Sequence, residues 1–340
     1  MRTCTLALAA LLLVACNDDR DPAPLVKTPR ILAMIVDPPE ALPGEDVRLR
    51  MLAFDPASRP LTYDYRICLD PGSFFGNITA DMGDPDTGAM AICQPVPGSD
   101  ATVVVDGMFT DQLYRLLPTF AAQAHLSADT LQGLVDTVGI PLQLRVRITA
   151  PDPVTGEPTL LITGVKEFGM TTRAHRTTNP PYVYFSIEDS VFLGGVDPDS
   201  FECTLWGGTD APVLHASVPG MPVRTAHLAP LDNPFDWEET YPYIDYSQSI
   251  QIGREGAYYS WFTTSDAPER CTREACHTIR PGDDTTQVSA TADPNDPTAF
   301  VTRETEWDLP STPGTYHFWL VVRDGHLGEA ACHTTITIIP

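Results

Sequence analysis

Proline and glycine divide this chain into short segments, which limits the folds it can adopt. The 340 residues include 33 prolines and 23 glycines. Between two of these breaks Val47, Leu49 and Met51 alternate with arginines, a period of two that is typical of a half-buried strand. Similar patterns predict strands at 31–36, 61–68, 101–105, 142–148 and 159–168. Several short strands separated by turn signals predict an all-β chain built from β-sandwiches.

One segment departs from the period of two. Apolar residues recur there at spacings of three and four, in two runs: Phe109, Leu113, Leu116, Leu117 and Phe120, then Leu131, Leu134, Val135 and Val138. This spacing predicts helices. Ser127 is placed to cap the second run, and Pro118 would break a single continuous helix. We therefore expect a short helical insertion near 109–138 that lays its apolar face on the sandwich.

A second set of strand patterns follows a boundary at 177–181. Strands are predicted at 182–187, at 256–262 with Tyr259 and Trp261 on one face, and at 332–339. In the segment 313–325 four alternating residues share a face that should point to the core: Tyr316, Phe318, Leu320 and Val322. The pattern predicts two sandwich domains, at 29–176 and 180–340.

Trp319 and His317 fall on the opposite face of that strand. A tryptophan facing outward is a candidate partner contact, because interface hot spots favour Trp, Tyr and Arg. The alternative is that the first domain or the loop 264–298 covers it. The sequence leaves both interpretations open.

The N-terminus has the features of an export signal. Arg2 precedes the apolar residues 6–15, a stretch too short to span a membrane, and Val14-Ala15-Cys16 resembles the cleavage site of a bacterial lipoprotein. The resemblance implies a signal peptide at 1–15, a lipidated Cys16 and a polar, proline-broken tether at 16–28. Asn17 after the cysteine favours the outer membrane, by resemblance to bacterial sorting rules. We find no other apolar run long enough to cross a membrane.

The charge of the chain excludes one class of partner. Asp and Glu number 45 against 21 Lys and Arg, a formal net charge of −24, and Lys27 and Lys166 are the two lysines. Binding to nucleic acid needs clustered cations on one face. The sequence therefore predicts no nucleic-acid partner, and attachment to the membrane through the lipid alone.

Six cysteines remain beyond the signal and the lipidation site. An even number in an exported protein indicates disulfides, although six cysteines allow fifteen pairings. Cys68 and Cys93 are the pair in the first half and should bridge each other, for about 3 kcal/mol of loop-entropy stabilisation. Cys271 and Cys276 can close a small loop. Cys203 and Cys332 then remain for each other, a pairing that the sequence leaves open.

Part of the second half resembles a known family. Trp261 on its strand, then Pro313-Gly314-Thr315-Tyr316, the alternating strand and Arg323-Asp324-Gly325 are similar to Ig-like modules of the polycystic-kidney-disease and cadherin-like type. The likeness is greatest to Ig-like envelope lipoproteins of myxobacterial type, covers about 256–339 well, and fits the first domain more loosely. It implies two Ig-like β-sandwiches and no particular activity. Gly328-Glu329, where that pattern usually has another glycine, is a departure from it.

Two metal sites are conceivable. Asp293, Asn295 and Asp296 resemble part of the cadherin calcium motif, and calcium prefers oxygen ligands; a loop of ordinary turn residues is the alternative. Cys271, Cys276 and His277, with His326 or His333, offer zinc ligands, but the spacing fits structural zinc poorly. An oxidising compartment favours a disulfide there instead. Calcium is thus the one possible cofactor.

The sequence favours a binding role over catalysis. It contains no nucleophile elbow, no His-Glu-x-x-His motif and no P-loop, so no catalytic residues are assigned and no enzyme activity is expected. The predicted function is a lipid-anchored, non-enzymatic cell-envelope protein that binds a protein or glycan partner or acts as a spacer. The alternative is an accessory subunit or hydrolase-like enzyme with a site near the helical insertion.

Overall fold

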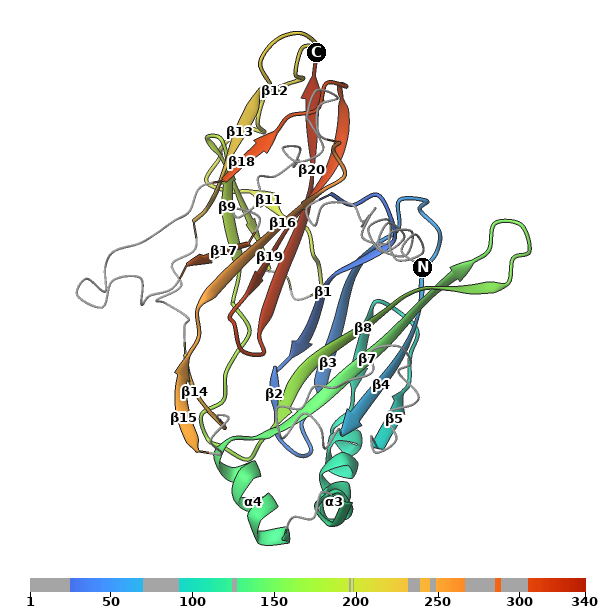
Figure 1. The fold of residues 1–340 in the computed structure, drawn as a ribbon, viewed down its shortest axis with the longest axis vertical. Coiled ribbons are helices and arrows are strands. Elements are labelled where there is room, and N and C mark those ends of the chain that lie inside the picture. The colour runs from blue at the N-terminus through green and yellow to red at the C-terminus, as the bar shows by residue number, and fades with distance from the viewer. Residues whose placement is uncertain are drawn as a thin grey trace, which may run out of the picture.

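The computed structural model is an elongated assembly of β-sheets, with the N-terminal half at one end and the C-terminal half at the other (Figure 1). It describes residues 25–69, 92–123, 127–195, 197, 199–231, 239–244, 249–266, 285–288 and 305–340. These residues form five sheets and two helices, so the predicted all-β class is confirmed. Neither of the two helices is long and apolar enough to cross a membrane.

The N-terminal half is a sandwich of two sheets. One sheet has the order β1 (Arg30–Asp37), β3 (Val47–Phe54), β6 (Thr102–Val105). The other has the order β2 (Glu40–Ala41), β8 (Pro158–Met170), β7 (Ile140–Pro151), β4 (Thr62–Leu69), β5 (Ile92–Val96). Alternate residues of both sheets enter a shared core, in which Leu49, Tyr65 and Leu144 are fully enclosed. The predicted strands of this half are therefore present.

Two helices close one end of this sandwich, α3 (Gly107–Gln123) and α4 (Ala128–Thr137) (Figure 1). Their apolar faces join the core through Leu113, Leu117, Leu131 and Val135, as predicted. The Ser127 side chain caps α4 by accepting the Thr130 N–H at 3.1 Å.

The expected effect of Pro118 needs correction. It lies inside α3, which continues to Gln123, so the break between the two helices comes later than the proline. Proline removes one backbone donor and crowds the preceding turn. The burial of Leu113 and Leu117 holds the helix against that cost.

The C-terminal half is a second sandwich. One sheet has the order β11 (Thr204–Leu205), β10 (Ser190–Gly194), β9 (Val183–Ile187), β13 (Thr225–Pro230), β18 (Thr305–Asp308). The other has the order β12 (Leu214–His215), β20 (Glu329–Ile339), β19 (Gly314–Arg323), β16 (Ala257–Thr263), β17 (Thr285–Val288). A separate hairpin pairs β14 (Thr240–Ile244) with β15 (Ile250–Arg254).

Aromatic residues fill the second core. Trp261, Trp307 and Phe318 are buried with their rings in contact, and Leu320 and Val322 lie in the same cluster. Tyr316 is partly buried against this cluster, and its hydroxyl donates to the Thr312 carbonyl at 2.7 Å. The predicted inward face of β19 is therefore present.

Two disulfides are present among the described cysteines, and both match the predicted pairings. Cys68–Cys93 joins directly opposed residues of β4 and β5. Cys203–Cys332 joins β20 to the segment before β11, a sequence separation of 129, and so ties one sheet of the second sandwich to the other. The predicted Cys271–Cys276 bridge lies outside the described residues.

The first described residues belong to the fold. Leu25 and Val26 are 5% and 2% exposed, and the Val26 N–H donates to the Thr263 carbonyl at 2.9 Å. The predicted tether at 16–28 is therefore too long. Its last residues pack on the second sandwich because they are apolar, unlike the charged residues that precede them.

Candidate functional site at the joint between the sandwiches

The outer faces of two sheets bind the sandwiches to each other. Ala33 and Ile35 of β1 pack against Val321 and Ala331 of β19 and β20. Because β1 contributes its alternate residues, Met34 and Val36, to the first core, both of its faces are buried. The two sandwiches thus share a continuous apolar interface, the joint, at which β1 of the first sandwich meets β19 and β20 of the second.

Trp319 lies inside this interface. It is 2% exposed and packs with Val26 and Leu32, and the Phe54 ring meets it edge-on at 4.8 Å. The prediction of an exposed partner contact at Trp319 is therefore wrong, and the alternative that the first domain covers it is right. The physical reason is that the apolar outer face of β19 is covered by the similarly apolar outer face of β1 and β3.

His317 belongs to the same interface and not to a free surface. Its ring lies 4.9 Å from Phe54, and its Nδ1 lies 2.9 Å from Nε2 of His333. Burial lowers the pKa of both imidazoles, and in His333 the neighbouring His317 adds to the effect. A neutral pair can share one hydrogen bond here, with one ring donating and the other accepting.

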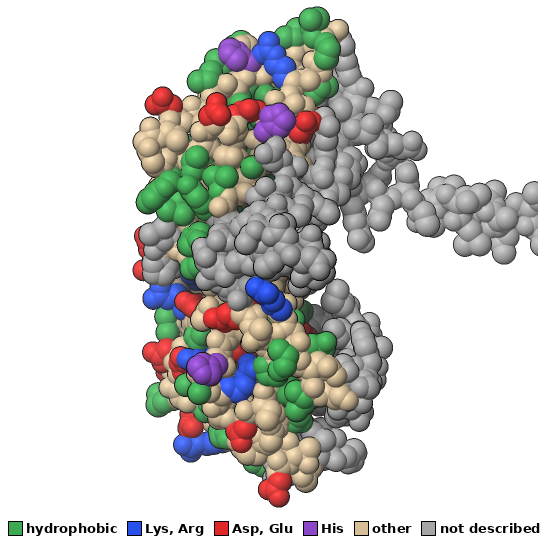
Figure 2. Space-filling model, turned by 90° about the vertical axis from the view of Figure 1, so that its left-hand side faces the viewer, with side chains coloured by type: hydrophobic (Ala, Val, Ile, Leu, Met, Phe, Trp, Pro, Cys, Tyr) green, Lys and Arg blue, Asp and Glu red, His purple; other side chains and the backbone are tan. Residues whose placement is uncertain are grey.

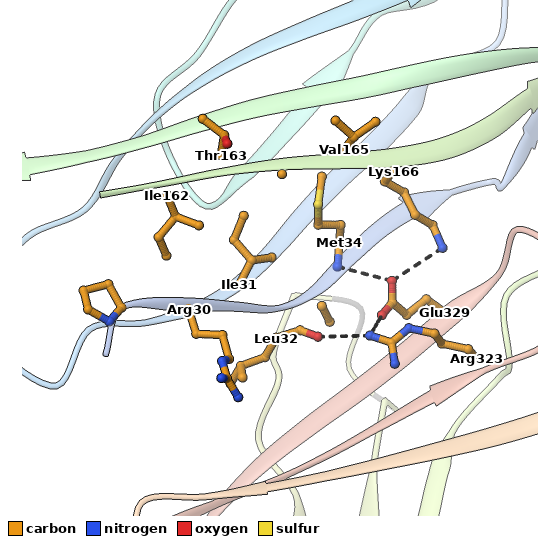
Figure 3. A pocket seen from close by; sticks show the side chains of 13 residues that line it. Arg30, Ile31, Leu32, Met34, Ile162, Thr163, Val165, Lys166, Arg323 and Glu329 are labelled. Atoms are coloured by element: carbon orange, nitrogen blue, oxygen red, sulfur yellow. Dashed lines mark hydrogen bonds and ion pairs between the residues drawn. The ribbon is translucent and has the colours of Figure 1, made fainter. Parts of the chain in front are cut away.

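Charged side chains cross the joint beside the apolar contacts (Figure 3). Glu329 is 3% exposed. Its carboxylate accepts the Met34 N–H at 3.3 Å and lies 3.5 Å from Lys166 Nζ and 2.9 Å from Arg323 Nη2. Arg323 also donates to the Leu32 carbonyl at 3.3 Å. One buried carboxylate of the second sandwich therefore contacts both β1 and β8 of the first.

Carboxylates from each half hold the connecting segment between the sandwiches. Glu40 accepts the Thr177 N–H at 2.7 Å and Glu239 accepts the Thr178 N–H at 2.9 Å. Asn179 donates to the Val36 carbonyl and accepts the Glu329 N–H, both at 2.9 Å. The linker is thus fixed by side chains of both halves.

Titratable groups at the joint have shifted pKa values. Burial, helped by the nearby Asp324, raises the pKa of Glu255 to about 9. Burial raises the pKa of Asp324 to about 6, against the effect of the His326 N–H that its carboxylate accepts. Burial lowers the pKa of His326 to about 4, and its ring stacks on Tyr241 at 3.7 Å. Near neutral pH, Glu255 and His326 are therefore uncharged.

We expect the Glu255→Gln variant to be more stable than the native chain at pH 8. The folded-state pKa of Glu255, about 9, lies above the ordinary value of 4.5. The unfolded chain therefore releases this proton first, and the free energy of unfolding falls as pH rises from 4.5 to 9. Glutamine does not titrate, so the variant does not lose stability in this way as pH rises.

Calorimetry at pH 5 and pH 8 measures this effect. The Tm advantage of Glu255→Gln should be several degrees at pH 8 and should shrink toward pH 5. The exposed Glu157→Gln variant serves as the control and should show no such trend. An advantage for Glu255→Gln that is equal at both pH values would contradict a buried neutral carboxyl.

A groove of about 390 Å³ opens on this joint. Its walls are residues 29–34 of the β1 edge and 162–166 of the β8 edge, with Arg323 and Glu329 at one end (Figure 3). Among the described strands, β1 pairs with β3 alone. β8 pairs with β7 along its length, and with β2 at Gly169 and Met170. Two sheet edges thus face each other across the groove.

The helical insertion carries a separate pocket. A space of about 310 Å³ between α3 and α4 is lined by Tyr114, Arg115, Leu117, Pro118, Leu131, Gln132 and Val135. Its lining is mainly apolar, which suits an apolar ligand. The alternative of an accessory subunit or hydrolase-like enzyme with a site near this insertion stays a prediction.

The remaining predicted sites lie where the structure gives no description. Cys16, the candidate calcium ligands Asp293, Asn295 and Asp296, and the residues Cys271, Cys276 and His277 are all outside the described ranges. Within those ranges no three His, Cys, Asp or Glu side chains are arranged to hold a metal ion. The joint residues Glu40, Lys166, Glu255 and Glu329 were not singled out from the sequence. The one available signal was that Lys166 is a rare lysine within a predicted strand.

Known proteins resemble this chain only weakly. The chain matches no protein-family model and no curated protein. Among solved structures, an Escherichia coli alpha-2-macroglobulin activated by porcine elastase aligns with a TM-score of 0.23 and 6% identity over 93% of this chain and 22% of that one. Dimeric latent PorU from Porphyromonas gingivalis aligns with a TM-score of 0.18 and 9% identity, over 92% of this chain and 34% of that one.

Extracellular domains 3–5 of Drosophila OTK align with a TM-score of 0.14 and 9% identity, covering 94% of this chain and all of that one. The present chain spans about a fifth of the length of the alpha-2-macroglobulin chain. Scores this low support no inference about this chain.

Proposed function

We propose that this chain is a lipid-anchored protein of the cell envelope, held in the outer membrane through Cys16, which binds a protein or glycan partner without catalysis. The observation that carries the proposal is the joint. Two sandwiches packed through Trp319, Ile35 and Val321 form one body, and a groove opens along their junction. A fixed arrangement of this kind suits a module that presents a preformed surface to a partner.

The position of the first described residues is compatible with the anchor. Leu25 and Val26 are packed at the interface, and only a short, charged stretch of chain separates them from Cys16. A lipid on Cys16 would therefore hold the joint close to the membrane surface. This arrangement fits the resemblance to Ig-like envelope lipoproteins, which remains part of the proposal.

The surface is compatible with a partner other than nucleic acid. On the face drawn in Figure 2 the acidic side chains are scattered over both halves, with cations among them. The formal net charge is −24. A dispersed acidic surface disfavours binding to polyanions and keeps the folded body soluble.

Replacing Cys16 with serine should release the protein from membranes or leave its signal uncut, because serine cannot carry the thioether-linked lipid. Membrane fractionation of cells and mass spectrometry of the N-terminal peptide measure this. Cys4→Ser is the matched control, since Cys4 leaves with the predicted signal. A cleaved Cys16→Ser protein that stays with the membrane would contradict the anchor.

A further inference from the structure

The outer edge of β8 is open along most of its length. Among the described strands, none pairs with this edge between Pro158 and Phe168. Val165 and Leu160 on this strand are 50% and 46% exposed. Natural proteins usually protect such an edge, because its unpaired N–H and C=O groups can pair with another chain.

The facing edge of β1 is already occupied by side chains. The Met34 N–H donates to Glu329 and the Leu32 carbonyl accepts from Arg323. The Ile31 and Met34 side chains reach the β8 backbone at Gly164, where an added Cβ would lie 2.7 Å from Ile31 Cδ1 and 2.9 Å from Met34 Sδ. Two main-chain groups of the β1 edge, the Met34 N–H and the Leu32 carbonyl, are therefore already bonded. The β8 edge, away from its contact with β1 at Gly164, is the one that can accept a strand.

The groove beside this edge is cationic. Arg30, Lys166 and Arg323 line it, and Glu329 is the one carboxylate among the described residues that do so. Lys166 does not shield the β8 edge, because its side chain is only 17% exposed and lies 3.5 Å from Glu329. An excess of cations at one groove of a chain with a net charge of −24 favours an anionic ligand there.

We propose that the β8 edge binds an extended, acidic peptide segment of a partner protein, which adds a strand to the sheet and places a carboxylate near Lys166 and Arg323. The inference rests on the proposed function, and it names the class of partner. Strand addition uses main-chain hydrogen bonds for affinity and side-chain contacts for specificity. The exposed Val165 offers an apolar contact to the added strand.

Binding of a labelled peptide to the full chain tests the proposal. The probes are peptides of roughly ten residues, the length of a sheet strand, that alternate Thr with Glu, Gln or Lys. The Thr-Glu peptide should bind about tenfold more tightly than the Thr-Lys peptide, and the difference should shrink as salt is added. Equal binding of all three peptides would overturn the charge argument.

Matched variants locate the binding. Val165→Glu places a like charge on the edge and should reduce binding of the Thr-Glu peptide about tenfold. Val154→Glu, the same substitution at the 90% exposed hairpin tip, should leave it unchanged. Equal binding by the two variants would overturn the assignment to the β8 edge.

A photo-crosslinker in the lipidated protein separates this inference from the proposed function. Placed at the exposed Thr163, it should capture an acidic segment of another protein, whereas at Thr155 of the hairpin tip it should not. Capture of a second copy of this chain, or of nothing, at Thr163 would overturn the peptide proposal. A partner that still co-purifies would, even then, support a binding function at another surface.

Discussion

Replacing Cys203 and Cys332 together with serine is expected to lower the free energy of unfolding by about 5 kcal/mol in the loop-entropy model, because the bridge closes a long loop. The sequence separation is 129 residues. The bridge also connects the two sheets of the second sandwich, and it lies against Gly194, where an added Cβ would clash with Cys332. Because residue 194 is a glycine, it has no side chain to fill the space left when the disulfide is removed.

The Cys68→Ser/Cys93→Ser pair provides the comparison. Its loop has a separation of only 25 residues, so the same reasoning expects a smaller loss, about 3 kcal/mol. Denaturant unfolding of both double variants measures the two losses. An equal or larger loss for the shorter loop would show that local packing outweighs the chain entropy.

Replacing Trp319 with alanine is expected to cost about 3 to 5 kcal/mol, the range for deleting a buried aromatic side chain. Trp319 is 2% exposed and contacts Phe54, Leu32 and Val26. Phe54 and Leu32 belong to the first sandwich, and Val26 lies in the segment that precedes it. The variant should therefore loosen the joint as well as lower the Tm.

Trp206 is the matched control, because it is 52% exposed on a turn of the second sandwich. Trp206→Ala should change the Tm little. Limited proteolysis adds a second measurement, since cleavage at the linker 171–182 should become faster in Trp319→Ala and not in Trp206→Ala. Unchanged stability and cleavage in Trp319→Ala would refute the packed joint.

The strands and helices with strong periodicity were predictable from the sequence. The alternation of β3, β4 and β19 and the spacing of Leu113, Leu117, Leu131 and Val135 each match a buried face. These signals are local, because each depends on residues only two to four positions apart in the sequence. The strands between 188 and 256, β10 to β15, have weaker alternation, so the pattern does not predict them.

The joint could not be predicted in the same way. Alternation places Trp319 opposite Phe318, but it does not say whether water, a partner or another part of the chain covers that face. The pKa of Glu255, raised to about 9, likewise depends on burial and on the charge of the nearby Asp324. Both depend on residues that are distant in sequence.

By itself the sequence determined the all-β class, the two-helix insertion and the disulfide Cys68–Cys93, because period, capping and the presence of two cysteines in the first half are properties of the chain. The pairing of Cys203 with Cys332 depends on the fold, which brings together residues 129 positions apart. The tertiary structure alone decided that Trp319 is internal, that Glu329 contacts both β1 and β8, and that the β8 edge stays open. The physical reason is that a strand pattern shows which side chains share a face. Only the packing of the two sandwiches determines what each face meets.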